Sequence, residues 1–527
     1  MINKLIALTA TIDSSKNLWR GRLLALFSGL MAAAALPPVY GIVLLIPAFV
    51  VLFKLLETST TGRKSFFVGW WFGLGHFAAG LYWVSYAFMV EASLYGWLAP
   101  VAVIFMAAGM ALFTGVFSYL VFISNRYIDK SAARVFVFAA IWVLVEWLRG
   151  WILTGFPWNL MGTVWGFSDT MMQSASLFGL YGLSLFTVFL ATIPVLILKP
   201  GIEGTDRGVV LAGLVGLLIL IGFGVVRLSL AENTQGTATR LRLVQPNVPQ
   251  KLKWKRELRA RHVRNLIELS QQPAIGKPPT VVIWPEAAVP YDLANTQGLK
   301  QAIATVAPKN GYLLVGAPKG SPRGQKPFKI WNSLFAIKPG GAVAATYDKA
   351  HLVPFGEYLP FRNLIGDKFG KLTAGRSDFS AGPGPQTINL DGLPSFSPLI
   401  CYEVIFPDAV TDKNDRPEWL LNLTNDAWFG LSAGPYQHLM AARFRSVEQG
   451  MPLVRVANTG ITVATDAYGQ ILGQIDLGEQ GIVDVDLAAA LKTLPLYARF
   501  GNAVPGVLVV LFLGLGLLLG RDKAIKS

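Results

Sequence analysis

Residues 395–403 read Ser-Phe-Ser-Pro-Leu-Ile-Cys-Tyr-Glu, an apolar run with the character of a β-strand that ends at the only cysteine of the chain. Two earlier runs also end at a polar residue: 281–286 reads Val-Val-Ile-Trp-Pro-Glu, and 344–349 reads Ala-Ala-Thr-Tyr-Asp-Lys. Domains of the α/β class place their reacting groups at the ends of strands. Glu286, Lys349 and Cys401 are therefore the first candidates for a reactive site.

The three side chains together suffice for acyl transfer through a thioester. A free thiol titrates near pH ~8.5, so Cys401 needs a neighbouring base or cation to become a strong nucleophile. A glutamate is a suitable base where an apolar wall raises its pKa, and a lysine can stabilise the oxyanion of a tetrahedral intermediate. Taken alone, a cysteine that ends an apolar strand is more often a small buried hydrophobe.

Residues 231–500, which contain all three candidates, have the pattern of a globular α/β domain. Strand-like runs occur at 241–244, 280–283, 312–315, 332–337, 342–347, 395–400, 419–423, 453–456, 461–464 and 481–485, with helical patterns near 254–270, 296–307 and 435–450. This alternation predicts stacked sheets covered by helices. A single cysteine cannot form an intramolecular disulfide, so the domain depends on its own core.

The rest of the chain is too apolar for a soluble protein, since 53% of all residues are hydrophobic and only 15% are charged. A membrane-spanning helix needs about 20 apolar residues. Eight segments qualify, near 23–38, 40–56, 65–87, 97–123, 135–153, 171–198, 208–227 and 505–520. The sequence thus predicts a transmembrane domain of seven helices over 1–230, an extramembrane domain over 231–500, and a C-terminal span and tail over 501–527.

The net charge of +15 is explained by membrane topology, so we expect no nucleic-acid partner. Basic residues precede the first span, follow the last and fill alternate loops, as the positive-inside rule requires. These residues are Lys4, Lys16, Arg20, Arg22, Lys54, Arg63, Lys64, Arg126, Lys130, Arg134, Lys199, Arg207, Arg521, Lys523 and Lys526. Both termini are predicted to be cytoplasmic, and the 231–500 domain to be periplasmic on a bacterial inner membrane.

Several motifs resemble known families. Trp284-Pro285-Glu286, Asp348-Lys349 and Ile400-Cys401-Tyr402-Glu403 resemble, in order and spacing, the motifs of the nitrilase or carbon–nitrogen hydrolase superfamily. Four further motifs are similar to those of the apolipoprotein N-acyltransferase family: Pro354-Phe355-Gly356-Glu357-Tyr358-Leu359-Pro360, Asn425-Asp426-Ala427-Trp428-Phe429-Gly430, Gln437-His438, and Glu146-Trp147-Leu148-Arg149 with Phe156-Pro157-Trp158-Asn159. The resemblance extends over nearly the whole chain and implies a nitrilase-like αββα sandwich beside about eight transmembrane helices.

The resemblance also implies a role for each candidate residue. Glu286 would be the general base, Lys349 the support of the oxyanion and Cys401 the nucleophile. Three more residues, Glu357, Tyr402 and Glu403, would lie in the pocket. Trp254 matches a family tryptophan associated with substrate binding, but it could equally be a packing aromatic.

The reaction implied by the resemblance has two membrane-anchored substrates. Cys401 would take an acyl chain from a glycerophospholipid, typically phosphatidylethanolamine, and release a lysophospholipid. The thioester would then acylate the α-amine of the S-diacylglyceryl cysteine at the N-terminus of a lipoprotein, with ping-pong kinetics. The reaction needs no cofactor and no metal, and His351 and His438 lack the spacing of a zinc site. We expect a monomer.

Alternatives remain open at this stage. The same chemistry could serve a membrane-tethered amidase, or the chain could be a transporter or scaffold whose outer domain only binds. Glu146 and Arg149 share a face of the fifth span, either as a structural pair or as a substrate contact. The basic run over 251–264 could be a solvated helix face or a surface for anionic lipid headgroups.

Overall fold

The computed structural model of the protein describes residues 18–198, 201–231, 236–274, 276–322, 324–360 and 378–520. Contacts divide the chain into two compact units, one of residues 1–85, 97–230 and 495–527 and the other of residues 86–96 and 231–494. Six basic residues of the predicted topology lie outside the described residues: Lys4, Lys16, Lys199, Arg521, Lys523 and Lys526.

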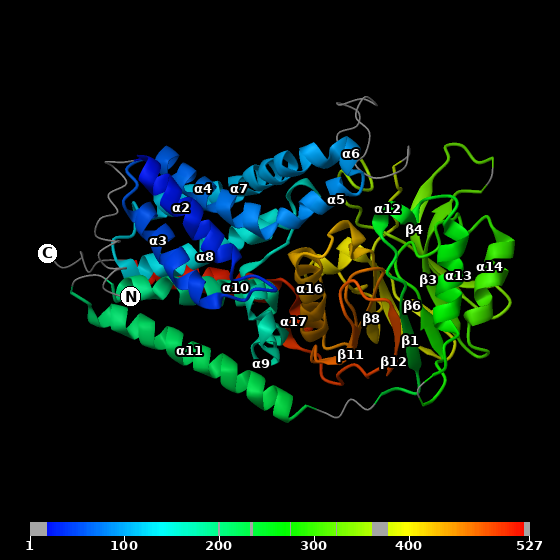
Figure 1. The fold of residues 1–527 in the computed structure, drawn as a ribbon. Helices are drawn as coiled ribbons and strands as arrows, with labels where there is room; N and C mark the ends of the chain where they lie inside the picture. The colour runs from blue at the N-terminus through cyan, green and yellow to red at the C-terminus, as the bar shows by residue number, and fades with distance from the viewer. Residues whose placement is uncertain are drawn as a thin grey trace. The chain divides into compact units, whose positions relative to one another are not determined.

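The first unit is helical, and a helix occupies each of the eight predicted spans (Figure 1). Its long helices are α2 (Leu18–Ala33), α3 (Leu45–Glu57), α4 (Gly62–Gly80), α7 (Ala99–Ser124), α8 (Ser131–Arg149), α10 (Ala175–Thr192), α11 (Gly204–Ser229) and α18 (Ala503–Gly520), and its short ones include α9 (Asp169–Met172) and α17 (Leu496–Phe500). Among the described residues, five helical stretches are long and apolar enough to cross a membrane, namely those containing α7, α8, α10, α11 and α18. The helices α2 and α3 have only 16 and 13 residues.

Small residues allow α4 and α7 to pack closely. A Cβ atom added at Gly69 would lie 2.2 Å from the main-chain oxygen of Thr114, and one at Gly73 would lie 2.8 Å from the Cα of Ala111. Such small-residue contacts are typical of helix pairs in membranes, where close approach of the backbones replaces the hydrophobic effect as the source of stability.

The second unit contains two six-stranded sheets. The first has the order β12-β1-β2-β3-β4-β5 and the second the order β11-β10-β9-β8-β7-β6. The strands are β1 (Arg240–Gln245), β2 (Val281–Ile283), β3 (Tyr312–Gly320), β4 (Ile330–Ile337), β5 (Val343–Asp348), β6 (Ile388–Leu390), β7 (Leu393–Ile400), β8 (Trp419–Thr424), β9 (Leu453–Ala457), β10 (Thr462–Thr465), β11 (Ile471–Ile475) and β12 (Gly481–Asp486). In each sheet three adjacent inner strands, β1-β2-β3 in the first and β7-β8-β9 in the second, are parallel.

Alternate residues of the strands fill two separate cores. Leu241 and Leu243 of β1 pack in one core with Phe396 and Ile400 of the other sheet. The opposite face of the first sheet packs on α13 (Arg259–Ser270) and α14 (Gln297–Ile303), and α16 (Ala433–Gln449) lies beside the second sheet (Figure 1). The predicted αββα sandwich is therefore confirmed, as is each of the ten predicted strands.

The two units differ from the predicted domain ranges at two short segments. Residues 86–96, which include α6 (Ala92–Tyr95) and most of α5 (Ser85–Met89), belong to the sandwich unit, where the ring of Tyr86 lies against Gly430. Residues 495–500 belong to the helical unit, because Tyr497 of α17 lies against Gly179 of α10. Both glycines have positive φ angles and leave no space for a side chain.

Candidate active site

Glu286 lies at the end of β2 and is only 7% exposed. The next residue, Ala287, has a φ of 45°, in the left-handed region, so the chain turns sharply there. Gly316 of β3 makes room for this turn, since a Cβ atom at that position would lie 2.7 Å from the Cα of Glu286. The Asn332 amide donates a hydrogen bond to Oε1 of Glu286 at 2.7 Å.

Lys349 follows β5 and is 1% exposed. Its ammonium nitrogen lies 2.9 Å from Oε2 of Glu357. The amide of Asn332 also donates to Oε1 of Glu357 at 3.1 Å, and its main-chain oxygen accepts from the Lys349 N–H at 2.9 Å. Asn332 therefore ties Glu286, Lys349 and Glu357 into one buried cluster.

Cys401 lies where β7 meets a short 3₁₀ helix, Cys401–Ile405. Its φ is 53°, a strained conformation for a residue other than glycine. Strain of this kind concentrates at functional sites, where the surrounding structure holds it in place.

Glu403 holds this turn against the loop that carries Lys349. Its Oε2 accepts a hydrogen bond from the Ile400 N–H at 2.7 Å. Its Oε1 accepts from the Tyr347 hydroxyl at 2.8 Å and from the N–H groups of Ala350 and His351 at 2.8 and 3.1 Å. The carboxylate thus uses both oxygens to fix the strand end before Cys401 and the chain after Lys349.

Burial and the neighbouring charges shift the pKa values of Glu286, Cys401 and Lys349. Burial raises the pKa of Glu286 above its usual value although Lys349 opposes that rise. Burial, together with the carboxylate of Glu286, raises the pKa of Cys401, and Lys349 acts in the opposite direction. Burial lowers the pKa of Lys349, but the carboxylates of Glu357 and Glu286 outweigh it and raise that pKa, so Lys349 stays charged. The predicted base, cation and thiol therefore come together.

Sequence reasoning missed a second polar cluster beside the cysteine. Oδ1 of Asp426 lies 2.9 Å from Nδ1 of His438, and its Oδ2 accepts from the Arg455 guanidinium at 2.5 Å. Nε2 of His438 lies 3.1 Å from the main-chain oxygen of Cys401. The motifs that contain Asp426 and His438 were visible in the sequence, but their pairing depends on the fold.

Asp426, His438 and Cys401 have ligand atoms within 4.8 Å of one another, a spacing compatible with a metal ion. The groups around these three residues, however, oppose the binding of a metal ion. Arg455 already neutralises Asp426, and together with His438 it lowers the pKa of that carboxyl although burial acts to raise it. A buried guanidinium that contacts both side chains would repel a metal cation.

The remaining predicted pocket residues have different surroundings. Glu403 lines a cavity of about 320 Å³ together with Tyr347, His351 and Phe406. Tyr402 is buried and its ring packs edge-on against His351 and Phe406. Trp254 is half-buried at the end of α12 (Gln250–Lys253), and its main-chain oxygen accepts from Arg259 at 3.2 Å.

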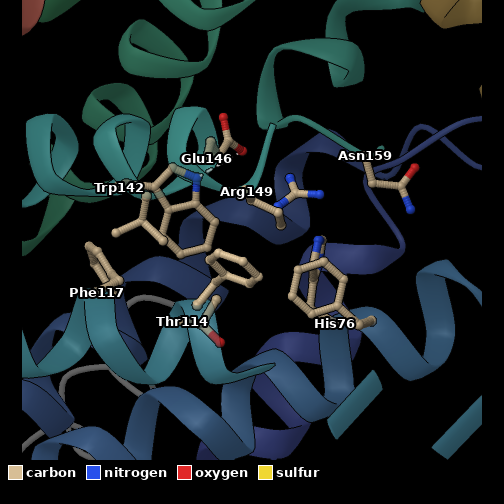
Figure 2. A pocket seen from close by; sticks show the side chains of 10 residues that line it. His76, Thr114, Phe117, Trp142, Glu146, Arg149 and Asn159 are labelled. Atoms are coloured by element: carbon tan, nitrogen blue, oxygen red, sulfur yellow. Dashed lines mark hydrogen bonds between the residues drawn. The ribbon is translucent and has the colours of Figure 1, made fainter. Parts of the chain in front are cut away.

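Glu146 and Arg149 are buried in the helical unit, where they line a small pocket with His76 and Asn159; Figure 2 shows Arg149 between Trp142 and Asn159. Oε1 of Glu146 accepts from the Trp142 indole at 3.0 Å and from the Met161 N–H at 2.9 Å. Arg149 donates to the main-chain oxygens of Phe156 and Trp158 at 2.7 and 2.6 Å. These hydrogen bonds fix the loop that follows α8. They favour a structural role for Glu146 and Arg149 over a contact with substrate.

Comparison with known proteins agrees with this architecture. Residues 240–493 match the family model described as carbon-nitrogen hydrolase, and residues 28–193 match the one described as apolipoprotein N-acyltransferase N-terminal domain. The sandwich and its cysteine thus define a carbon–nitrogen hydrolase domain joined to a helical membrane domain.

Relatives that match this chain along nearly its full length show which family within this class it belongs to. The chain is 38% identical to an apolipoprotein N-acyltransferase of Rhodopseudomonas palustris, over 95% of this chain and 96% of that protein. It is 40% identical to one of Bradyrhizobium diazoefficiens, over 94% of each chain. The chain belongs to the apolipoprotein N-acyltransferase family and is a multi-pass membrane acyltransferase.

Among solved structures, a carbon–nitrogen hydrolase superfamily protein of Xanthomonas campestris matches 55% of this chain and 99% of its own, at 17% identity and a TM-score of 0.34.

Proposed function

We propose that Cys401 carries a fatty acyl chain, as a thioester, from a glycerophospholipid to the α-amine of the S-diacylglyceryl cysteine of a lipoprotein. The observation that carries this assignment is the buried cluster in which the Asn332 amide bonds to Glu286 and Glu357, and Glu357 pairs with Lys349. Glu286 and Lys349 of this cluster interact electrostatically with Cys401.

In the first half-reaction Glu286 removes the proton of the Cys401 thiol, and the thiolate attacks the carbonyl carbon of the phospholipid ester. Negative charge moves to the carbonyl oxygen, where the ammonium of Lys349 stabilises it. The intermediate collapses as the carbon–oxygen bond to glycerol breaks. Protonated Glu286 gives its proton to the leaving oxygen, and a lysophospholipid departs.

In the second half-reaction the free α-amine of the lipoprotein cysteine attacks the thioester. Glu286 accepts a proton from this amine, and Lys349 stabilises the second oxyanion. The carbon–sulfur bond breaks, an amide remains on the lipoprotein, and the Cys401 thiolate recovers its proton from Glu286. Ping-pong kinetics follow from this order.

Membership of the acyltransferase family over nearly the whole chain favours this function over the two alternatives. A tethered amidase needs only the sandwich, whereas the relatives match the helical unit as well. Neither transport nor scaffolding requires a base, a cation and a thiol that are buried in one cluster.

The finer assignments belong to the same proposal. Phosphatidylethanolamine is the donor, and the enzyme acts as a monomer. The distribution of basic residues supports an inner-membrane protein with both termini in the cytoplasm and the sandwich in the periplasm. Glu357 and Glu403 order the site, and Trp254 and Tyr402 contribute to substrate binding.

The test is intact-mass analysis of the purified full-length protein after incubation with phosphatidylethanolamine alone. We expect a fatty-acyl adduct on Cys401, release of lysophospholipid, and loss of the adduct when a diacylglyceryl-cysteine peptide is added. Cys401→Ser should form no thioester. Hydrolysis of a small amide through Cys401 without any acyl adduct would instead establish the amidase.

A further inference from the structure

Lys253 is a buried lysine to which the proposed mechanism assigns no role. It ends the short helix α12 and is 3% exposed, which is unusual for a lysine. Its ammonium donates a hydrogen bond to the main-chain oxygen of Glu286 at 3.0 Å. In the described part of the chain this carbonyl is its one hydrogen-bond acceptor. The positive charge is therefore not neutralised by a carboxylate in direct contact.

The helix that carries Lys253 is attached to both halves of the site. At its first residue, Oε1 of Gln250 accepts from the Asn425 amide at 2.8 Å, next to Asp426 and after β8 of the second sheet. At its last residue, Lys253 contacts the turn after β2 of the first sheet. This one turn of helix consequently links the strand ends that hold the general base to those that surround the thiol.

The charges of the cluster show what Lys253 contributes. Lys253 interacts electrostatically with Glu286 and Cys401, and burial lowers its pKa to about 8 although both groups raise it. The other charged groups around the thiol are Glu286, Lys349 and Asp426. Glu357 is paired to Lys349, and Asp426 is neutralised by Arg455, so that the Asp426–Arg455 pair adds no net charge. When the proton moves from Cys401 to Glu286, the thiolate and Glu357 carry two negative charges, and Lys349 and Lys253 carry two positive charges. Without Lys253 the same state would have an excess negative charge in a buried site, which opposes ionisation of the thiol.

We propose that Lys253 is a positioning residue that fixes the main chain of Glu286 and supplies the second cation required for formation of the Cys401 thiolate. This inference rests on the proposed role of Cys401 as nucleophile. It goes beyond that role because it assigns a function to α12, the helix that also presents Trp254.

The experiment exploits the presence of a single cysteine in the chain. Alkylation of the full-length protein by iodoacetamide reports only on Cys401, and its rate as a function of pH follows the thiolate. Lys253→Gln keeps a hydrogen-bond donor but removes the charge, Lys253→Met removes both, and Lys253→Arg keeps the charge. Lys251→Met, at an exposed position of the same helix, is the matched control.

We expect Lys253→Gln and Lys253→Met to shift the pH profile of alkylation upward by about one unit or more, so that the rate at neutral pH falls about tenfold. Acyl-enzyme formation from phosphatidylethanolamine should fall with it, more in Lys253→Met, and Lys253→Arg should restore part of the rate. Lys251→Met should match the wild type. A folded Lys253→Gln variant with the wild-type profile would overturn the proposal, and so would failure of both neutral variants to fold, which would make Lys253 a folding residue.

The same measurement separates this inference from the proposed function. If alkylation of Cys401 left acyl transfer intact, the assignment of the nucleophile would fail whatever the Lys253 variants did. If alkylation abolished acyl transfer while the variants kept the wild-type profile, only the role of Lys253 would fail.

Discussion

The ammonium nitrogen of Lys349 lies 2.9 Å from a carboxylate oxygen of Glu357, and both side chains are shielded from solvent. Because Oε2 of Glu357 also accepts the Val353 N–H at 2.8 Å, this carboxylate fixes the lysine in place and keeps it charged. The cation that we propose stabilises the oxyanion is thereby held in place before the substrate binds, and such preorganised charge is what makes electrostatic catalysis effective.

Glu357→Gln should keep the fold and slow acyl-enzyme formation by about 100-fold, since the amide cannot hold Lys349 as a carboxylate does. The measurement is the rate at which the acyl adduct appears by intact mass. Glu268→Gln, at an exposed position of the same unit, is the control. Equal rates in the two variants would mean that the ion pair has no part in catalysis.

Gly316→Ala should impair the site without touching any candidate catalytic side chain. The new Cβ atom would lie 2.5 Å from the main-chain oxygen of Pro285 and 2.7 Å from the Cα of Glu286, so the turn that carries the base must move. A displacement of about 1 Å can cost about 100-fold in rate, and we expect a loss of that size in lysophospholipid release. Gly298→Ala, where no atom lies within 4 Å of the added Cβ, should leave the rate unchanged. Full activity of Gly316→Ala would contradict the assignment of Glu286.

The pH dependence of the reaction should reflect the environment of Glu286. A general base must be ionised, so activity is lost as the pH falls through its pKa. Burial raises that pKa above the ordinary value of a glutamate although Lys349 opposes the rise. The acidic limb of kcat/KM should therefore lie at a higher pH than an exposed glutamate would give. Glu286→Gln should abolish the limb and leave only a low, flat rate. A limb that persisted in this variant would have to come from another carboxyl group.

Most of the sandwich could be predicted from the sequence because its strands are buried on both faces. The strand β2 is apolar throughout and β8 is mostly apolar, and every residue of both strands is buried, as is typical of parallel strands covered on both faces. The two strands that were missed, β6 and β11, lie at the edges of the second sheet. The sequence of β11, Ile-Leu-Gly-Gln-Ile, does not alternate apolar and polar residues, so it lacks the pattern that indicates a half-buried strand. Its Ile471 and Leu472 are exposed.

The site was predicted only in part, for a different reason. Glu286, Lys349 and Cys401 follow strands and match family motifs, so their position and the resemblance were enough to propose them as site residues. Asn332 and Lys253 have no such mark, because an asparagine within a strand and a lysine in a basic run are ordinary surface residues in most sequences. Their importance depends on burial and on partners 46 and 33 positions away.

Arg149→Met tests whether this arginine of the helical unit is structural. Its loss would leave the main-chain oxygens of Phe156 and Trp158 without their donor, at a cost of about 1–3 kcal/mol each. We expect a lower thermal unfolding temperature in detergent and an unchanged KM for phosphatidylethanolamine in the protein that remains folded. Arg126→Met, at an exposed position, should unfold like the wild type. An unchanged unfolding temperature with a raised KM would instead identify Arg149 as a substrate contact.

Glu403 offers the most selective test of how the nucleophile is positioned. All four groups that bond to its carboxylate are donors, three on Oε1 and the Ile400 N–H on Oε2. In Glu403→Gln, the amide oxygen can still accept the three bonds, but the NH₂ group must then face the Ile400 N–H, donor against donor. The residue before Cys401 loses its partner and the strained turn loses its support.

We therefore expect Glu403→Gln to unfold close to the wild-type temperature but to form the acyl-enzyme about 100-fold more slowly. Tyr347→Phe removes only one of the bonds to Oε1 and leaves the Ile400 contact intact, so its rate should fall much less. Intact-mass kinetics of both variants, with iodoacetamide alkylation of Cys401 at each time point, distinguish a misplaced thiol from an unfolded one. If Tyr347→Phe were as slow as Glu403→Gln, the bond to Ile400 would not be the one that positions the nucleophile.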